Sequence, residues 1–254
     1  MTPEITVIIP NFNKSKYLEQ CINSVLNQTF KSWNLIVIDD ASTDESKKIL
    51  NKFINHKQIA IIKLKKNKGV SFCRNLGMRL AQAEYISFLD SDDYWLEDKL
   101  EKHLNFLKNK NYVFSYTDYF FFNENNKNVK KTTNLHSEFN LLSFVKNTSI
   151  NTSTIILKKN SIGYSRFKKM TLLEDYIFKC DLLKKNIIAY KFNQASTAYR
   201  ITNDNRSSGL LKNLIQLIQV NKKYNKFNIF FNFYVVTNVI FNSIKKYGLR
   251  KYLQ

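Results

Sequence analysis

Glycine, proline and cysteine are scarce in this chain of 254 residues, which contains five, two and three of them. Collagen-like, linker-like and disulfide-rich proteins need far more of these residues, so the composition excludes all three classes. Because Cys21, Cys73 and Cys180 are odd in number and widely spaced, we expect neither a disulfide framework nor a zinc knuckle. Hydrophobic residues make up 44% of the sequence, which is enough for the core of a large globular domain.

The sequence also lacks an uninterrupted apolar run that is long enough to cross a membrane. Its most apolar stretch, residues 227–244, is broken by four Asn residues, and this polar content argues against a bilayer span. Residues 1–10 contain no basic region followed by an apolar region, so no signal peptide is predicted. These observations predict a cytoplasmic protein without a transmembrane helix.

Acidic side chains are scarce in the second half of the chain. The whole sequence carries 40 Lys and Arg against 20 Asp and Glu, a net charge of +20. Residues 1–103 have 15 basic and 13 acidic side chains, whereas residues 205–254 have nine basic and no acidic ones. Such a basic segment can attach to an anionic membrane surface, bind nucleic acid, or simply keep the protein soluble. The charge pattern alone allows all three interpretations.

Strands and helices alternate along the first 93 residues. Short apolar runs that end in turn residues predict buried strands at residues 5–9, 35–38, 59–64 and 85–89. Apolar residues at helical spacing follow cap residues and predict helices at residues 17–26, 46–54 and 70–81. This alternation is typical of a parallel α/β sheet with both faces covered, in which ligands bind beyond the carboxyl ends of the strands.

The pattern after residue 93 is looser. It predicts a helix at residues 96–107, a strand at 112–116, a hairpin around 123–128, a strand at 152–157, a helix at 174–185 and extended segments at 187–189 and 196–201. From residue 208 onward the pattern predicts helices. Asparagines and Lys246 share one face of the last helix, opposite Phe, Tyr, Val and Ile.

Three acidic residues directly follow the predicted strand at residues 85–89. Asp90, Asp92 and Asp93 lie within four positions, and their mutual repulsion is costly unless a cation sits among them. In an extended chain, the side chains of Asp90 and Asp92 point to the same side. Carboxylate oxygens suit Mg²⁺ or Mn²⁺, and either ion could also bind the phosphates of a substrate. The alternative is an acidic helix N-terminus that complements the helix dipole.

Two further turns combine a predicted strand or helix with polar side chains. Asp39 and Asp40 close the strand at residues 35–38, ahead of a Ser-Thr cap. A carboxylate there can accept a hydrogen bond from a base N–H or a ribose hydroxyl, or it can belong to a well-capped turn. Residues 67–77 form a turn with glycine that leads into a helix and presents Arg74. Its guanidinium can grip a diphosphate, pack against a base or form a surface salt bridge.

Taken together, these segments resemble glycosyltransferase family 2. The similarity lies in residues 7–13, 37–44, 67–75 and 88–93, which match the successive motifs of the family in order and spacing. The match is close over roughly the first 100 residues and looser over the next 100. The resemblance implies a GT-A fold, a nucleotide-sugar donor, a divalent metal ion (Mn²⁺ or Mg²⁺) and inversion at the anomeric carbon.

The resemblance also implies roles for individual residues at the donor site. Pro10, Asn11 and Asn13 are expected to line the base pocket, Asp40 to recognise the base, Arg74 to flank the nucleotide, Asp90 to lie at the ribose and Asp92 to bind the metal ion.

Inverting transfer further needs a carboxylate that takes the proton of the acceptor hydroxyl. In the family this base is the Asp of a Glu-Asp pair at the start of a helix, and here the pair is Glu174-Asp175. The resemblance therefore implies Asp175 as the base. The pair could also serve only as helix N-terminal acids, and Asp118 could compete for a role in the acceptor cleft.

Two arginines follow the predicted base. The segments that contain Arg200 and Arg206 resemble a post-catalytic segment of some polysaccharide-building members of the family, and either side chain could neutralise the leaving diphosphate or be a surface charge. We predict a GT-A catalytic domain at residues 1–204, with a nucleotide-binding half at 1–103 and an acceptor-side half at 104–204. Residues 205–254 are predicted to form a basic, amphipathic helical tail.

The sequence thus predicts a metal-dependent inverting glycosyltransferase. It would move a sugar such as a hexose or an N-acetylhexosamine from a UDP donor to a glycan or lipid-linked acceptor in bacterial surface polysaccharide synthesis. The alternatives are a nucleotide-sugar-binding protein without transferase activity and a basic nucleic-acid-binding module. No nucleic-acid-binding signature is present, so no nucleic acid is expected as a partner.

The aromatic face of the tail permits two interpretations. It can attach the enzyme peripherally to the inner face of the cell membrane, next to lipid-linked acceptors. It can also pack on the catalytic domain or on a second subunit. The residues expected on this face are Phe230, Phe231, Tyr234, Val235 and Phe241.

Overall fold

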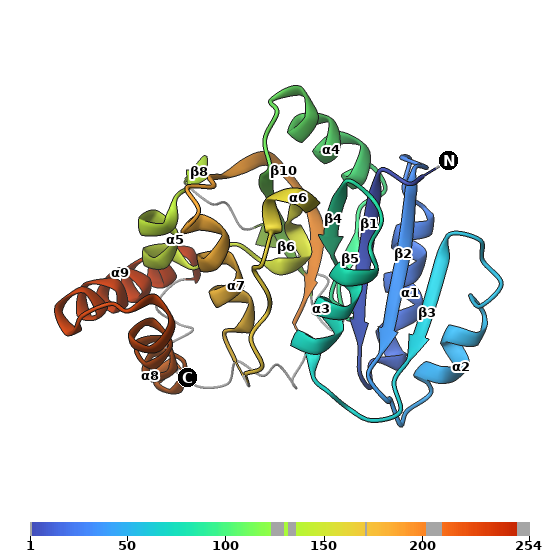
Figure 1. Cartoon of the computed structure of the whole chain (residues 1–254), viewed down its shortest axis with the longest axis horizontal. Coiled ribbons are helices and arrows are strands. Elements are labelled where there is room, and N and C mark those ends of the chain that lie inside the picture. The colour runs from blue at the N-terminus through green and yellow to red at the C-terminus, as the bar shows by residue number, and fades with distance from the viewer. Residues whose placement is uncertain (1, 123–129, 132–135, 171, 202–209, 248–254) are drawn as a thin grey trace.

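The protein is built around one mixed β-sheet with helices on both faces (Figure 1). The structure is a computed structural model that describes residues 2–122, 130–131, 136–170, 172–201 and 210–247. Within these residues the sheet has ten strands, eight of them in the order β3-β2-β1-β4-β9-β6-β10-β5, with β7 beside β6 and β8 beside β10. Neighbouring strands are parallel from β3 to β4, and β9 is antiparallel to both of its neighbours.

The strands and helices have the following bounds. The strands are β1 (Ile5–Asn11), β2 (Trp33–Asp39), β3 (Ile59–Lys63), β4 (Tyr85–Phe88), β5 (Tyr94–Trp95), β6 (Phe114–Phe122), β7 (Lys130–Lys131), β8 (Glu138–Phe139), β9 (Ile156–Lys158) and β10 (Ala189–Arg200). The helices are α1 (Ser15–Leu26), α2 (Ser46–Asn51), α3 (Val70–Leu80), α4 (Lys99–Asn109), α5 (Leu141–Asn147), α6 (Lys159–Ile162), α7 (Glu174–Leu183), α8 (Leu210–Val220) and α9 (Ile229–Tyr247), with single turns η1 (Thr152–Thr154) and η2 (Asn221–Asn225).

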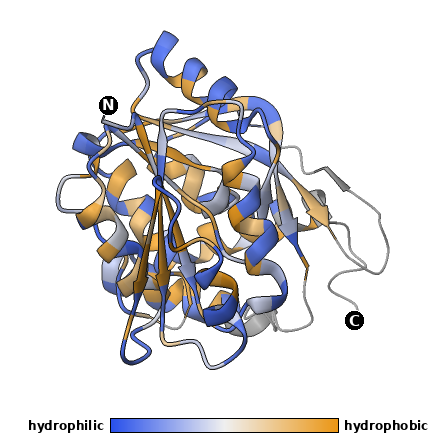
Figure 2. Cartoon of the chain, turned by 90° about the vertical axis from the view of Figure 1, so that its right-hand side faces the viewer, coloured by the Kyte–Doolittle hydropathy of each residue, from blue (hydrophilic) through white to orange (hydrophobic). Residues whose placement is uncertain are grey.

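Side chains along the central strands point alternately to the two faces of the sheet, and this divides the core into two layers. In β1, Ile5, Val7 and Ile9 pack with α1, α2 and α4, whereas Ile8 packs with α3 and the second half of the chain. Every residue of β1 is buried, as expected for a parallel strand that is covered on both faces. Figure 2 shows this distribution, with hydrophobic segments through the middle of the molecule and hydrophilic ones on its outer helices and loops.

Two buried residues have unusual surroundings. Gly77 brings α3 against β1 so closely that a Cβ added there would overlap Ile8 and lie 3.0 Å from its Cγ1. Lys99 is fully buried, and its ammonium lies 4.0 Å from the centroid of the Trp95 ring with no hydrogen-bond partner among the described residues. Burial lowers the pKa of Lys99 to about 7.

The four strands and three helices predicted for the first 93 residues are confirmed. Two later predictions are wrong in part. The segments predicted at residues 187–189 and 196–201 are one strand, β10, which bulges between Phe192 and Thr197 where it pairs with β6. The strand predicted at residues 152–157 begins as η1 and becomes β9 only at Ile156. The turn of the predicted hairpin, residues 123–128, lies outside the described residues.

The C-terminal segment is helical where it is described, as the sequence predicts. Leu217 and Val220 of α8 and Val235 of α9 are buried in the core layer that contains α5 and α7. The boundary at residue 204 therefore stays a prediction. No helix among the described residues is long and apolar enough to span a membrane.

The interpretation of the aromatic face as a membrane-attachment face is wrong for two of its five residues, and the alternative, packing on the catalytic domain, is confirmed for these two. Val235 is fully buried and Phe231 packs partly buried against the core, whereas Phe230, Tyr234 and Phe241 are exposed. The error arises because the core takes up the stripe of the helix that carries the asparagines, and the sequence does not reveal which stripe faces inward.

Candidate active site

The carboxyl ends of β1, β2 and β4 collect most of the predicted donor-site residues at one edge of the sheet. β1 ends at Asn11 beside Asp39 of β2, and the Asp40 N–H donates to the Asn11 carbonyl oxygen at 2.8 Å. β4 runs parallel to β1 and leads into Asp90. The edge is therefore the place where a parallel sheet of this kind binds a ligand.

The loops after β1 and β2 are held together by polar side chains. The Asn11 Nδ2 donates to Asp39 Oδ1 at 2.8 Å and to Ser42 Oγ at 3.2 Å. The Asn13 N–H donates to Ser42 Oγ at 3.0 Å, and the Asn13 Oδ1 accepts from the Thr43 N–H at 2.8 Å. These bonds fix the shape of the predicted base pocket. Pro10 and Asn11 lie buried in its floor, whereas Asn13 is exposed.

Asp40 is buried, and both of its carboxylate oxygens hold the loop that precedes α3. Oδ1 accepts from the Lys68 N–H and Oδ2 from the Gly69 N–H, each at 2.7 Å. Gly69 has a φ of +86°, which a side-chain-bearing residue rarely adopts. Asp40 thus fixes the turn that begins α3, and its recognition of a base stays a prediction.

Arg74 of α3 joins the two halves of the predicted site. Its side chain is 5% exposed, and it donates to Asp90 Oδ1 at 2.6 Å and to Glu174 Oε1 at 3.4 Å. Its guanidinium carbon also lies 5.1 Å from the centroid of the Phe167 ring. Although burial opposes ionisation, the charges of Asp90 and Glu174 raise the pKa of Arg74. Arg74 therefore positions Asp90 and the start of α7, and contact with the nucleotide stays a prediction.

Each of the three clustered aspartates has its own partner in the protein. Asp90 contacts Arg74, and the Lys14 ammonium lies 2.9 Å from Asp92 Oδ2. Asp93 is buried and accepts from Ser153 Oγ at 2.7 Å. Burial and the charges of Asp90 and Asp92 raise the pKa of Asp93 well above its ordinary range. Side chains of the protein thus compensate part of the repulsion, and a metal ion among the three carboxylates stays a prediction.

The donor set nevertheless fits a divalent metal ion. Asp90 and Asp92 remain 32% and 21% exposed, so both carboxylates can be reached from solvent. The Lys14 ammonium shows that Asp92 is placed to hold a cation. The described residues contain no cluster of three or more His, Cys, Asp or Glu that could hold a metal, so oxygens of a bound ligand would have to complete the coordination.

Arg200, at the end of β10, lies in the wall behind these aspartates. It is 3% exposed, its Nε donates to the Asp92 carbonyl oxygen at 2.8 Å, and its N–H donates to Asp93 Oδ1 at 3.1 Å. Its guanidinium also packs on the rings of Tyr17 and Phe122. In this arrangement Arg200 supports the Asp92–Asp93 turn, and stabilisation of a leaving group stays a prediction. Arg206 lies outside the described residues.

Asp175 stands in the first turn of α7, next to Glu174. Its side chain is 36% exposed, and its Oδ2 accepts from Lys179 Nζ at 2.7 Å and from Thr152 Oγ1 at 3.2 Å. Burial opposes ionisation, but the buried Lys179 ammonium lowers the pKa of Asp175 below its ordinary value. Asp175 is therefore ionised at neutral pH and partly open to solvent. Asp118, the alternative base, is buried with the Lys191 ammonium at 3.5 Å.

The η1 turn connects the aspartate cluster with Asp175, and sequence reasoning missed it. Ser153 Oγ accepts from the Asp90 N–H at 3.1 Å and donates to Asp93, while the neighbouring Thr152 donates to Asp175. Two neighbours of the predicted base pocket, the exposed Phe12 and the half-buried Lys14, were also missed. Phe12 is 44% exposed between two residues of the predicted pocket, and an aromatic side chain at a strand end was the signal that could have found it.

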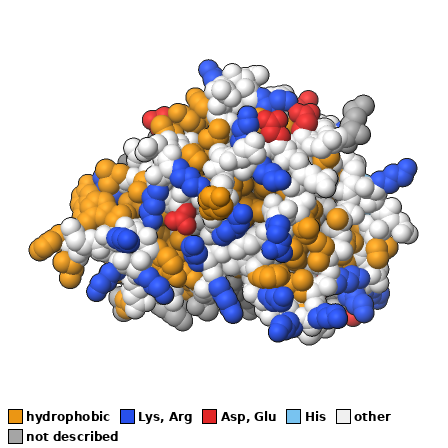
Figure 3. All heavy atoms as spheres, in the orientation of Figure 1, with side chains coloured by type: hydrophobic (Ala, Val, Ile, Leu, Met, Phe, Trp, Pro, Cys, Tyr) orange, Lys and Arg blue, Asp and Glu red, His pale blue; other side chains and the backbone are white. Residues whose placement is uncertain are grey.

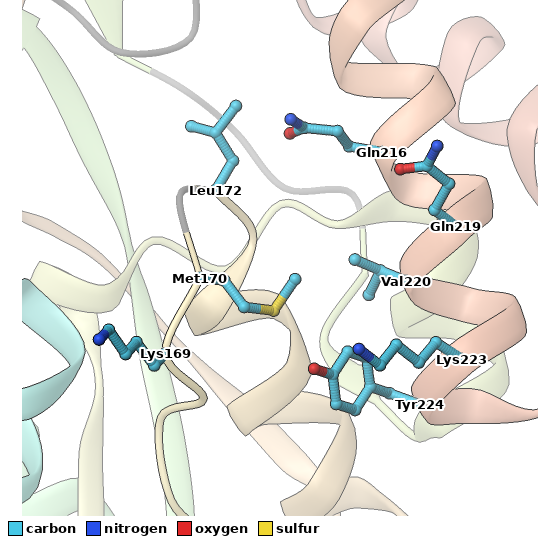
Figure 4. Close-up of a pocket in the computed structure, with 8 residues that line it drawn as sticks. All are labelled: Lys169, Met170, Leu172, Gln216, Gln219, Val220, Lys223 and Tyr224. Carbon is cyan, nitrogen blue, oxygen red and sulfur yellow. The ribbon is translucent and has the colours of Figure 1, made fainter.

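A cavity of about 340 Å³ lies beside this site, between the loop that enters α7 and helices α8 and η2 (Figure 4). Its walls combine cationic, amide and apolar side chains, which are Lys169, Met170, Leu172, Gln216, Gln219, Val220, Lys223 and Tyr224. In Figure 4, Leu172 points toward Gln216, and Met170 lies opposite Tyr224. The loop leads within two residues into Glu174, at the start of α7.

Comparisons with known proteins identify relatives of this chain. The model of the family described as glycosyl transferase family 2 matches residues 6–180. The Bacillus subtilis protein TuaG, named as a glycosyltransferase of teichuronic acid biosynthesis, is 32% identical over 83% of this chain and 84% of its own. The Escherichia coli protein WfaP, named as a UDP-Glc:α-D-GlcNAc-diphosphoundecaprenol β-1,3-glucosyltransferase, is 32% identical over 86% of this chain and 85% of its own.

Solved structures show the same fold. The crystal structure of S. aureus TarS residues 1–349 in complex with UDP-GlcNAc superposes with a TM-score of 0.73 and 19% sequence identity. The match covers 95% of this chain and 73% of that one.

Proposed function

We propose that this chain, which belongs to glycosyltransferase family 2 and has the GT-A fold, transfers a sugar from a UDP-linked donor to a lipid-linked acceptor. Family membership and the named relatives make it a glycosyltransferase of bacterial surface polysaccharide synthesis that uses a nucleotide sugar. The observation that carries the proposal is the connection of a donor edge to a candidate base. Arg74 joins Asp90 to Glu174, and Asp175 follows in the next position.

A UDP donor is supported by the pocket and by the relatives. The loops after β1 and β2 form a rigid floor at the carboxyl edge, and the exposed Phe12 ring stands beside it, where it can stack on a base. WfaP is named for UDP-Glc, and the TarS structure contains UDP-GlcNAc. We infer that Asn13 and Phe12 contact the base, and that Asp40 acts chiefly by holding the Lys68–Gly69 turn in place.

A divalent metal ion, Mn²⁺ or Mg²⁺, is part of the proposal. Asp92 would hold it, with Asp90 beside it, and the Lys14 ammonium would have to leave Asp92. When bound, such an ion neutralises charge on the diphosphate of the donor.

The protein supplies the proton acceptor for the transfer. Asp175 takes the proton of the acceptor hydroxyl while the hydroxyl oxygen forms a bond to the anomeric carbon, and the bond from that carbon to the diphosphate breaks with its electron pair on the diphosphate. Attack opposite the leaving group inverts the configuration. Because Lys179 lowers the pKa of Asp175, the carboxylate is a weak base. We therefore infer late proton transfer, once bond formation has made the hydroxyl acidic.

The acceptor and the location of the reaction follow from the relatives and from charge. The acceptor named for WfaP carries an undecaprenol lipid, which resides in a membrane. A protein with a net charge of +20 is attracted to an anionic membrane surface. We therefore propose peripheral attachment at the inner face of the cell membrane.

One experiment tests the proposed reaction. The purified protein is incubated with Mn²⁺ and a panel of UDP-, GDP- and TDP-sugars, with and without a lipid-linked N-acetylglucosamine diphosphate acceptor, and the released nucleoside diphosphate is measured. We expect acceptor-dependent release of UDP from a UDP-hexose or a UDP-N-acetylhexosamine, and loss of this release when the metal is chelated. Acceptor-dependent release from another nucleotide sugar alone would contradict the proposed donor.

A further inference from the structure

The outer face of α9 exposes large hydrophobic side chains. The exposed fractions are 78% for Ile229, 83% for Phe230, 72% for Phe233, 47% for Tyr234 and 66% for Phe241. With a rotation of about 100° per residue, all five lie on one side of the helix. They form a continuous stripe, which we call the α9 stripe.

The opposite side of α9 faces the protein and is partly polar. Asn232 is 3% exposed, and its Nδ2 donates to the Phe227 carbonyl oxygen at 3.0 Å. The Asn242 Nδ2 donates to the Lys146 carbonyl oxygen of α5 at 3.1 Å. Val235 on this side is fully buried, and Phe231 and Val239 pack against the core, so apolar and polar side chains together hold the helix on the protein. The other side exposes large hydrophobic side chains, whereas an ordinary surface helix exposes polar residues there.

The α9 stripe is large for an uncovered surface. Five side chains of this size, mostly exposed, present on the order of 600 Å² of apolar area, which equals or exceeds the largest apolar patch on a typical monomer. Figure 3 shows the hydrophobic atoms gathered at the end of the molecule that α9 forms, with Lys and Arg atoms near them. Patches of this size mark interaction surfaces.

Cationic side chains border the stripe. Lys222, Lys223 and Lys226 are exposed in and just after η2, directly before α9. The Lys146 ammonium lies 4.8 Å from the centroid of the Tyr234 ring. Residues 205–254 contain no Asp or Glu, so no acidic residue of this segment offsets the positive charge.

We propose that the α9 stripe and the three lysines beside it dock the enzyme on an anionic lipid membrane. The aromatic and Ile side chains would enter the boundary between headgroups and acyl chains, and the lysines would lie at the level of the lipid phosphates. A symmetric contact with a second copy is disfavoured, because it would bring identical lysine clusters of a chain with a net charge of +20 together. This inference rests on the proposed function only in that a lipid-linked acceptor resides at the same surface.

Vesicle flotation without donor or acceptor tests the docking separately from the chemistry. The full chain is mixed with vesicles of phosphatidylglycerol and phosphatidylcholine in equal parts, or of phosphatidylcholine alone. We expect binding to the anionic vesicles that weakens with salt. The Phe230→Ser/Phe233→Ser variant should bind them at least ~10-fold more weakly. Replacement of Lys222, Lys223 and Lys226 by Gln should weaken binding to anionic vesicles by ~10²-fold and should change binding to neutral vesicles little.

Matched controls separate this face from general hydrophobicity and charge. Tyr164→Ser removes a side chain that is 98% exposed outside α9, and the triple replacement of Lys47, Lys48 and Lys57 by Gln removes three exposed charges at the opposite end of the molecule (Figure 1). The tyrosine control should bind anionic vesicles like the parent protein. The lysine control should lose far less vesicle affinity than the variant with Gln at positions 222, 223 and 226. UDP release with a water-soluble acceptor should be unchanged in the Phe230→Ser/Phe233→Ser variant and in both controls.

Three results would overturn the proposal. The first is a parent protein that stays unbound to anionic vesicles at low salt. The second is a Phe230→Ser/Phe233→Ser variant that floats as well as the parent. The third is a dimer in light scattering that this variant dissociates, which would assign the α9 stripe to a second copy. Failure of the UDP-release assay alone would refute the proposed reaction and leave the docking result standing.

Discussion

Replacing Arg74 by methionine removes the buried charge that joins the donor edge to α7. The Arg74 side chain is 5% exposed and contacts Asp90 at 2.6 Å and Glu174 at 3.4 Å. Methionine keeps most of the apolar stem that packs near Phe167, so the main loss is electrostatic. The variant therefore reports the strength of this connection.

The size of the loss follows from the exposure of the two carboxylates. Asp90 is 32% exposed, so water can hydrate it in the variant, and we expect its pair to contribute no more than ~1 kcal/mol. Glu174 is 11% exposed and would remain buried without its guanidinium. Loss of one partner of a buried pair costs about 3–5 kcal/mol. We expect Arg74→Met to lower the free energy of unfolding by ~3 kcal/mol.

Urea denaturation followed by circular dichroism measures this loss. The Arg74→Met/Glu174→Gln double variant should recover part of it, because the second change removes the buried charge. As a matched control, Lys52→Met breaks the exposed pair with Glu19 and should cost ~1 kcal/mol or less. A loss below ~1 kcal/mol for Arg74→Met, or no recovery in the double variant, would refute the reasoning.

Three further predictions concern buried packing and charge. Because the pKa of Lys99 is lowered to about 7, the unfolded chain binds more protons between about pH 7 and its ordinary value of 10.5, so stability should rise with pH across this window. Denaturation curves of Lys99→Met should show a smaller rise of stability with pH and a free energy of unfolding that is a few kcal/mol higher at pH 7. An unchanged pH dependence of stability would contradict this prediction. Gly77→Ala should lower the free energy of unfolding by ~1–3 kcal/mol, because the new Cβ overlaps Ile8, and thermal melting at the parental temperature would contradict this. Lys14→Met should strengthen Mn²⁺ binding in the absence of nucleotide by up to ~5-fold, measured by calorimetry, because it removes the ammonium that contacts Asp92. Weaker Mn²⁺ binding in this variant would exclude competition between Lys14 and the metal ion for Asp92.

The sequence was most informative where local pattern alone determines structure. The buried strands β1 to β4 and the turns after them could be predicted because apolar runs end in polar residues at each strand end. The partners of those polar residues could not be predicted. Asp40 binds backbone N–H groups 28 and 29 residues away, and Arg74 contacts a carboxylate 100 residues away. Such contacts depend on how the chain folds back, which local periodicity does not encode.

The later part of the chain shows a second limit. The wheel of α9 separates asparagines from aromatic side chains, but it does not state which stripe packs on the protein. Hydrophobicity favours the aromatic stripe, whereas the side that packs on the protein carries Val235 together with Asn232 and Asn242. Similarly, β10 was predicted as two pieces because its bulge between Phe192 and Thr197 breaks the alternation.

The central claim, that Asp175 is the base of a glycosyl transfer, is tested most directly by Asp175→Asn. The amide is nearly isosteric, but it cannot take the proton of the acceptor hydroxyl. Donor affinity is measured by calorimetry with a UDP-sugar and Mn²⁺, and transfer is measured as acceptor-dependent UDP release. The account predicts parental donor affinity and a loss of turnover of ~10²-fold or more. Transfer at close to the parental rate would contradict it.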